Sequence, residues 1–220
     1  MAELESLDMT NLLANGVLSL QLLLPAFNDF AERVGLDVRV PLEDRRVTKS
    51  HIGKSSSSLM VTFDDHHQFN WHSTERDLYK GRIYYLDTQL NGSVGAARFR
   101  QLTNQPTLIS TNGARVIAEE AMKSLGFDLK KINAGEPRVG QFTYQDKPGD
   151  VPMPVPLFGI RWFPKGIKKP EWHDRLIEIQ VSGLTKKIVY FSASPAADAA
   201  VTTDLRRFTT NRKEKARAPK

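Results

Sequence analysis

The sequence predicts an α+β fold in which helices pack on one side of an antiparallel sheet. Two segments place apolar residues at helical spacing, and each ends at a glycine. Each is followed by short stretches of alternating apolar and polar residues, which is typical of strands with one buried face. The chain has 220 residues, 40% of them apolar, which is enough for one or two domains with a sizeable core.

The first predicted helix lies near the start of the chain. Thr10 or Asn11 is suited to cap its first turn, and residues 27, 30, 31 and 34 fall on one apolar face. Pro25 is expected to bend or restart this helix because proline has no amide hydrogen to donate. Gly35 is expected to end it in a left-handed conformation.

The second predicted helix begins after Ser110 and ends at Gly126. Asn91-Gly92, which lies between the two helices, predicts a hairpin turn. Alternation of apolar residues predicts strands after both helices. The expected strands span residues 59–63, 68–72, 82–87, 138–144, 155–163, 175–181 and 187–191.

The two helix ends resemble each other in sequence. Residues 33–38 and 124–129 follow one pattern, with a glycine and an aspartate at matching places. A helix that closes on glycine would produce part of this match by itself, and two related helix-plus-sheet units would produce all of it. The expected organisation is therefore a helix with antiparallel strands over 1–104, a second such unit over 105–204, and a basic, disordered tail over 205–220.

The second unit ends in a hairpin that is similar to a known family. Residues 177–188 alternate apolar and polar positions and pass through Gly183 to a lysine-rich strand start. In this pattern, residues 109–192 resemble PepSY-type domains of cystatin-like architecture, although those domains tend to carry an acidic residue where this chain has Ser182-Gly183. The resemblance implies a non-catalytic protein-interaction or inhibitory module that acts outside the cytoplasm.

The net charge of +6 is concentrated at the end of the chain. Residues 205–220 hold seven positive side chains and one negative, which accounts for the whole net charge. A basic tail of this kind favours nucleic acid or an anionic surface as an alternative partner. Its candidate binding residues are Arg206, Arg207, Arg212, Lys213, Lys215 and Arg217.

A second candidate binding surface is the segment from 162 to 172, which mixes lysines with aromatic residues. Tryptophan is enriched at the energetic centres of protein interfaces, so this loop is the best candidate surface for a protein or peptide partner. An ordinary connector with exposed lysines, and with Trp162 on the predicted inward face of its strand, explains the same residues more simply. Lysines with aromatic rings also suit single-stranded nucleic acid. The candidate residues are Trp162, Lys165, Lys168, Lys169 and Trp172.

Catalytic chemistry is the less favoured interpretation of this sequence. Asp64, His66 and His72 would form a metal-dependent hydrolase site if one hairpin face held all three, but a polar turn explains them more simply. Gly53-Lys54-Ser55 does not complete a phosphate-loop motif. The chain has no cysteine, no nucleophile-elbow motif and no sequence signal for a cofactor.

Targeting signals are equally sparse. The longest apolar stretch, 17–27, is interrupted by Ser19 and Gln21 and is too short to span a membrane. Acidic residues precede it, so no signal peptide is expected in the chain as written. Export to the periplasm or the extracellular space is expected from the PepSY resemblance alone.

Overall fold

The computed structural model describes residues 17–52, 58–74, 77–90, 92–197 and 202–208. Within these ranges the helices are α3 (Val17–Val34), α4 (Gly92–Leu102) and α5 (Thr111–Ser124). Short 3-10 turns cover Asp44–Arg46, Trp172–Asp174 and Pro195–Ala197. The strands are β1 (Val47–Ile52), β2 (Ser58–Phe63), β3 (His67–Thr74), β4 (Asp77–Asp87), β5 (Arg138–Tyr144), β6 (Met153–Trp162), β7 (Ile177–Ser182), β8 (Ile188–Ala193) and β9 (Thr203–Asp204).

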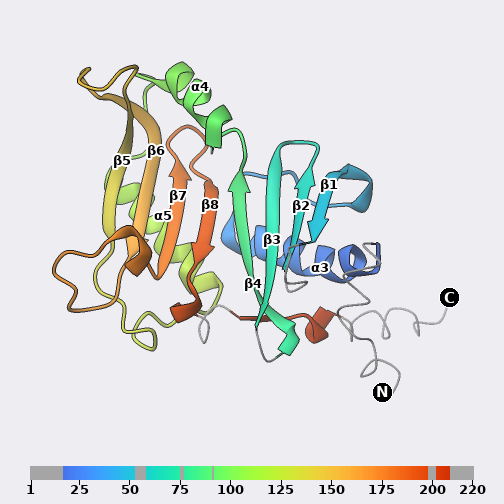
Figure 1. The fold of residues 1–220 in the computed structure, drawn as a ribbon. Helices are drawn as coiled ribbons and strands as arrows, with labels where there is room; N and C mark the ends of the chain where they lie inside the picture. The colour runs from blue at the N-terminus through green and yellow to red at the C-terminus, as the bar shows by residue number, and fades with distance from the viewer. Residues whose placement is uncertain (1–16, 53–57, 75–76, 91, 198–201, 209–220) are drawn as a thin grey trace, which may run out of the picture.

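The strands form one antiparallel sheet, which confirms the predicted α+β class. Its order is β1-β2-β3-β4-β8-β7-β6-β5, and the short strand β9 pairs with β4 beside β8. Helices α3 and α5 lie on the same side of the sheet, and α4 lies at one end of the other side (Figure 1). Each of α3 and α5 is followed by four strands that pair in succession.

Both predicted helix ends are confirmed. Helix α3 runs without interruption through Pro25 and ends at Gly35, whose φ is +71° and whose amide donates to the carbonyl of Ala31 at 3.0 Å. Helix α5 begins after Ser110, whose hydroxyl accepts from the amide of Gly113, and ends at Gly126 with φ of +79°. The predicted cap at Thr10 or Asn11 lies outside the described residues.

The predicted hairpin turn at Asn91-Gly92 is wrong, because helix α4 begins at Gly92. This helix brings Leu102 into a small apolar cluster with Val155, Leu157 and Val189 on the side of the sheet opposite α3 and α5. Phe99 of α4 also packs edge-on against Phe142, with ring centroids 6.1 Å apart. Burial of these side chains outweighs the local turn preference of an Asn-Gly pair.

The two halves of the sheet meet where β4 pairs with β8. The pairs are Tyr85 with Phe191 and Leu86 with Tyr190. The ring of Phe191 lies 5.1 Å from that of Phe30 on α3 and 6.3 Å from that of Phe127, which follows α5. The main apolar core therefore continues across this seam and joins the segments predicted as 1–104 and 105–204.

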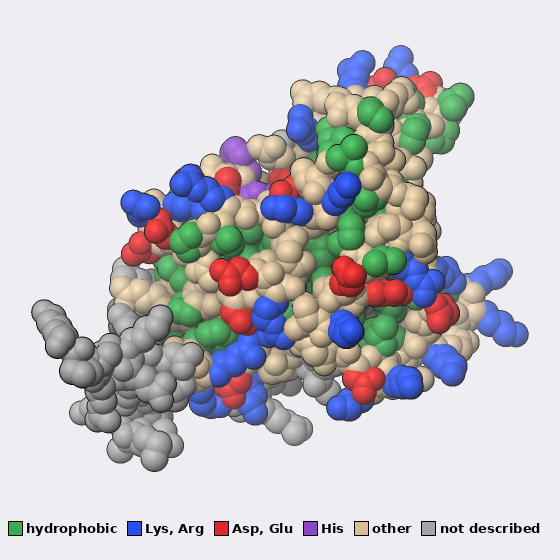
Figure 2. All heavy atoms as spheres, turned by 180° about the vertical axis from the view of Figure 1, so that it is seen from behind, with side chains coloured by type: hydrophobic (Ala, Val, Ile, Leu, Met, Phe, Trp, Pro, Cys, Tyr) green, Lys and Arg blue, Asp and Glu red, His purple; other side chains and the backbone are tan. Residues whose placement is uncertain are grey.

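The helix-covered side carries charges of both signs. Figure 2 shows acidic and basic side chains interspersed over this side, with apolar patches between them. Among the described residues, none of the helices is both long and apolar enough to cross a membrane.

Candidate functional site

The side of the sheet opposite α3 and α5 is the main candidate site. Helix α4 covers one end of it (Figure 1), and at its centre Asn70, Arg82 and Tyr84 are partly exposed, whereas Glu178 and Gln180 are buried. We call this surface the open face. Its central residues are Gln68, Asn70, His72, Arg82, Tyr84, Arg161, Glu178, Gln180, Tyr190 and Ser192.

Strand alternation places these polar residues on the open face. On β7, Ile177, Ile179 and Val181 enter the core, so Glu178 and Gln180 point to the opposite side. The strand register aligns Glu178 with Arg161 of β6 on one side and with Ser192 of β8 on the other. Residues from strands far apart in the sequence thus form continuous rows across the sheet.

A buried carboxylate organises one of these rows. Glu178 is 2% exposed, and its Oε1 accepts from Nε of Arg161 at 3.0 Å and from Nε2 of Gln180 at 3.1 Å. Its other oxygen, Oε2, contacts the guanidinium of Arg175. Burial lowers the pKa of both arginines from its usual value. Two guanidiniums share one carboxylate, which leaves one surplus positive charge at this part of the open face.

Beside this cluster lies a hollow with a volume of about 290 Å³, which we call the open-face hollow. Its lining includes Tyr84, Trp172, Arg175, Tyr190 and Ser192. Trp172 is 71% exposed, and the guanidinium carbon of Arg175 lies 3.7 Å from the centre of its ring system. The hollow therefore combines a cation, three aromatic rings and a hydroxyl in one accessible place.

His72 lies on β3 within the open face, paired across the strands with Arg82 of β4. Its ring packs edge-on against Tyr84 at 4.8 Å. Partial burial and then the positive charge of Arg82 lower the pKa of His72 below its usual value of 6.5. His72 is therefore neutral at pH 7, and protonation of this imidazole opposes folding.

We expect replacement of Arg82 to raise the pKa of His72. In Arg82→Met the repelling charge is absent, so NMR titration of the imidazole should give a higher midpoint than in the unchanged protein. Because the folded-state pKa lies below the unfolded value, the free energy of unfolding decreases as pH falls from about 6.5 through the lower folded-state pKa, and this decrease should be smaller in the variant. Lys49→Met, on β1, is the control and should leave the midpoint unchanged. An unaltered midpoint in Arg82→Met would contradict this assignment.

The structure separates the residues predicted for the 162–172 surface. Trp172 is exposed, and Lys165, Lys168 and Lys169 are also exposed on the loop before it. Trp162 is fully buried, so its assignment to the surface is wrong. The reason is strand alternation, because Trp162 follows Phe158 and Ile160 on the face of β6 that meets the core.

The predicted metal ligands do not come together. Asp64 and Asp65 both bind the guanidinium of Arg46, through contacts of 3.0 and 2.5 Å, and His66 forms the turn before β3 with φ of +65°. His72 lies six residues further along that strand, a distance of about 20 Å. Among the described residues, no group of three or more His, Asp or Glu side chains is placed to hold a metal ion.

Part of the predicted basic tail packs on the body of the protein. The guanidinium of Arg206 lies 4.9 Å from the ring centre of Tyr79, and Arg207 pairs with Asp29 at 3.0 Å. The remaining tail candidates, Arg212, Lys213, Lys215 and Arg217, lie outside the described residues, as does Gly53-Lys54-Ser55.

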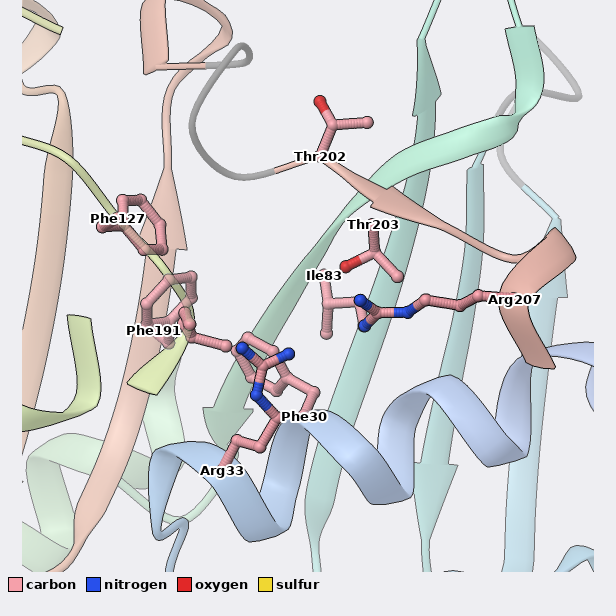
Figure 3. Close-up of a pocket in the computed structure, with 9 residues that line it drawn as sticks. Phe30, Arg33, Ile83, Phe127, Phe191, Thr202, Thr203 and Arg207 are labelled. Carbon is pink, nitrogen blue, oxygen red and sulfur yellow. The ribbon is translucent and has the colours of Figure 1, made fainter. Parts of the chain in front are cut away.

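A second, smaller hollow lies on the helix side, at the seam between the two halves (Figure 3). Its floor includes Phe30 and Phe191, and Arg33 and Arg207 point into it from opposite sides. Arg33 donates from Nε to the carbonyl of Ser124 at 3.0 Å and shares Asp29 with Arg207. The hollow has a volume of only about 50 Å³, and Arg33 joins the end of α3 to the end of α5 there. We therefore assign this hollow a structural role.

The sequence predicts a sheet with helices on one side and its other face or its edges free for a partner, but it does not identify the residues of the open face. The signal available in the sequence was the pair of polar residues, Glu178 and Gln180, inside an otherwise apolar strand. Their partners Arg161, Ser192 and Tyr190 come from other strands and follow only from the register. Comparison of the chain with models of known protein families, with curated proteins and with solved structures found no match.

Proposed function

We propose that this protein is a non-catalytic binding module that uses the open face to hold a protein partner. The observation that supports this proposal is the unequal cover of the sheet. Helices α3 and α5 pack on one side, whereas the centre of the other side holds partly exposed arginines and tyrosines on β4, β6 and β8. Arg, Tyr and Trp are the residue types that contribute most energy in protein interfaces.

The state of Glu178 supports binding over catalysis. A general base needs a lone pair that is available to a substrate proton. Glu178 is almost completely buried, and three donors, from Arg161, Arg175 and Gln180, already engage its oxygens. Its role in the proposed site is to hold two guanidiniums in fixed positions at the surface.

The charge distribution favours protein over nucleic acid as the partner. Nucleic-acid binding draws on many phosphate contacts, and acidic groups near the contact surface oppose it. Beside the open-face hollow, the 3-10 turn that holds Trp172 carries Asp174 and follows Glu171. Nucleic acid bound through the tail and the lysine loop remains the alternative.

The PepSY-like and cystatin-like assignment belongs to this proposal, with two related units and a place of action outside the cytoplasm. Two features support the related units. The same number of residues separates Gly35 from the start of β1 and Gly126 from the start of β5. Arg33 and Ser124, which occupy matching places in the sequence repeat, hydrogen-bond to each other.

Site-specific photo-crosslinking in cells that naturally express the protein tests the proposed surface. A benzophenone side chain at position 70, in the centre of the open face, should give a discrete crosslinked species that resists nuclease. The matched control is position 120, an exposed site on α5, where no such species is expected. Equal crosslinking from both positions, or none from position 70, would overturn the proposal, and a nuclease-sensitive adduct would establish the nucleic-acid alternative.

A further inference from the structure

We propose that the open-face hollow receives one acidic side chain of the partner, with a neighbouring aromatic side chain packed against Trp172. This inference rests on the proposed function and gives the chemistry of its central contact. The hollow lies where β4 and β8 join the two halves, so a segment bound there contacts strands from both.

The charge of the site determines the first part of the recognition. Arg161 and Arg175 share the single carboxylate of Glu178, which balances only one of their two charges, and Arg82 lies on the neighbouring strand β4. Arg161 donates from Nε to Glu178, and its guanidinium carbon lies 5.5 Å from the ring centre of Phe142. Arg175 is therefore the cation that lines the hollow. A carboxylate bound here neutralises the surplus charge in a partly desolvated place, where charge-assisted hydrogen bonds are strong.

The aromatic rings of the hollow determine which kind of side chain lies next to the acidic one. Trp172 holds one face of its indole against Arg175 and leaves most of its area to solvent, and Tyr84 and Tyr190 form the opposite wall. A volume of about 290 Å³ matches one large side chain better than an extended polymer. Since aromatic pairs gain energy beyond simple burial, a Phe or Tyr beside the acidic residue suits this wall.

The acidic groups around the hollow limit the number of negative charges it accepts. Asp174 and Glu171 lie on the same turn as Trp172. A single carboxylate in the hollow contacts Arg175, whereas a chain of phosphates would also meet repulsion from Asp174 and Glu171. The arrangement therefore favours a partner segment that carries one acidic side chain among apolar ones.

Quenching of tryptophan fluorescence gives a direct readout, because Trp71 and Trp162 are fully buried and Trp172 is exposed. The probe is the peptide acetyl-Gly-Ser-Phe-Glu-Phe-Ser-Gly-amide, compared with the same peptide carrying Gln in place of Glu. We expect the Glu peptide to protect Trp172 from acrylamide and the Gln peptide to bind about tenfold more weakly. Ser192→Glu, which adds a negative charge inside the hollow, should lower the affinity for the Glu peptide by about tenfold. Gln21→Glu adds the same charge on α3 and should have no effect.

Three results would overturn the inference: equal affinity for the two peptides, no protection at about 1 mM peptide, or stronger protection by oligouridylate than by the Glu peptide. Thermal unfolding of Ser192→Glu verifies that its loss of binding is not loss of fold. If the Glu peptide does not bind but the crosslink at position 70 still forms, the proposed contact with an acidic side chain is wrong and the proposed function is not affected. Failure of the crosslink removes the proposed function itself.

Discussion

Glu178→Ala is expected to lower the free energy of unfolding by about 3 kcal/mol or more. Removal of the carboxylate leaves Arg161 and Arg175 partly buried without their shared partner, and loss of one member of a buried ion pair typically costs about 3–5 kcal/mol. Arg161 is partly solvated, so the lower end of that range applies. Urea unfolding followed by circular dichroism measures the change.

The matched control for this variant is Glu120→Ala, at an exposed position of α5, which should change stability by less than about 0.5 kcal/mol. Glu178→Gln keeps an acceptor for one arginine, so its loss in free energy of unfolding should lie between those of Glu178→Ala and Glu120→Ala. A loss below about 1 kcal/mol in Glu178→Ala would mean that water replaces the carboxylate at little cost, and the view of Glu178 as the organiser of the open face would have to be abandoned.

Phe191→Ala is expected to destabilise both halves of the protein together, by about 3–5 kcal/mol. The ring of Phe191 is 1% exposed and contacts Phe30 of α3 as well as Phe127 after α5. Its removal opens a cavity in the core that the two halves share. Because the core is continuous across the seam, the variant should still unfold in a single transition at lower denaturant concentration.

Two buried tryptophans allow each half to be followed separately. Trp71 reports on β3 and Trp162 on β6, and a Trp172→Phe background removes the exposed indole. Single-tryptophan versions that keep only Trp71 or only Trp162 should show coincident transitions with and without Phe191→Ala. Separate midpoints for the two reporters would instead assign the halves to independent domains, with the boundary near the predicted residue 104.

The features that the sequence predicts correctly are local ones. Gly35 and Gly126 end their helices because only a residue without a side chain adopts the left-handed conformation at low cost. The strand at 138–144 is predicted with its observed bounds. Alternation in β7 correctly sends Ile177 and Ile179 to the core. Each of these properties depends on residues within a few positions of one another.

The features that the sequence does not predict depend on contacts between distant segments. Helix α4 contains glycine and arginine and forms because Phe99 and Leu102 find partners on β5, β6 and β8. The open face requires the register of five strands, and the pairing of β4 with β8 joins residues about a hundred positions apart. No local pattern encodes that pairing, so the candidate site was out of reach of motif analysis, which pointed to Trp162 instead.

The pairing of β4 has a consequence for synthesis of the chain on the ribosome. One edge of β4 can pair with β3 as soon as β4 is made. Its other edge stays unpaired until β8 and β9 are made, which happens only after α4, α5 and three further strands. Until residue 204 emerges, the nascent first half exposes an unpaired strand edge next to the apolar ring of Tyr85. Exposed strand edges bind other chains, so this interval is when the newly made protein is most vulnerable to aggregation and most dependent on chaperones.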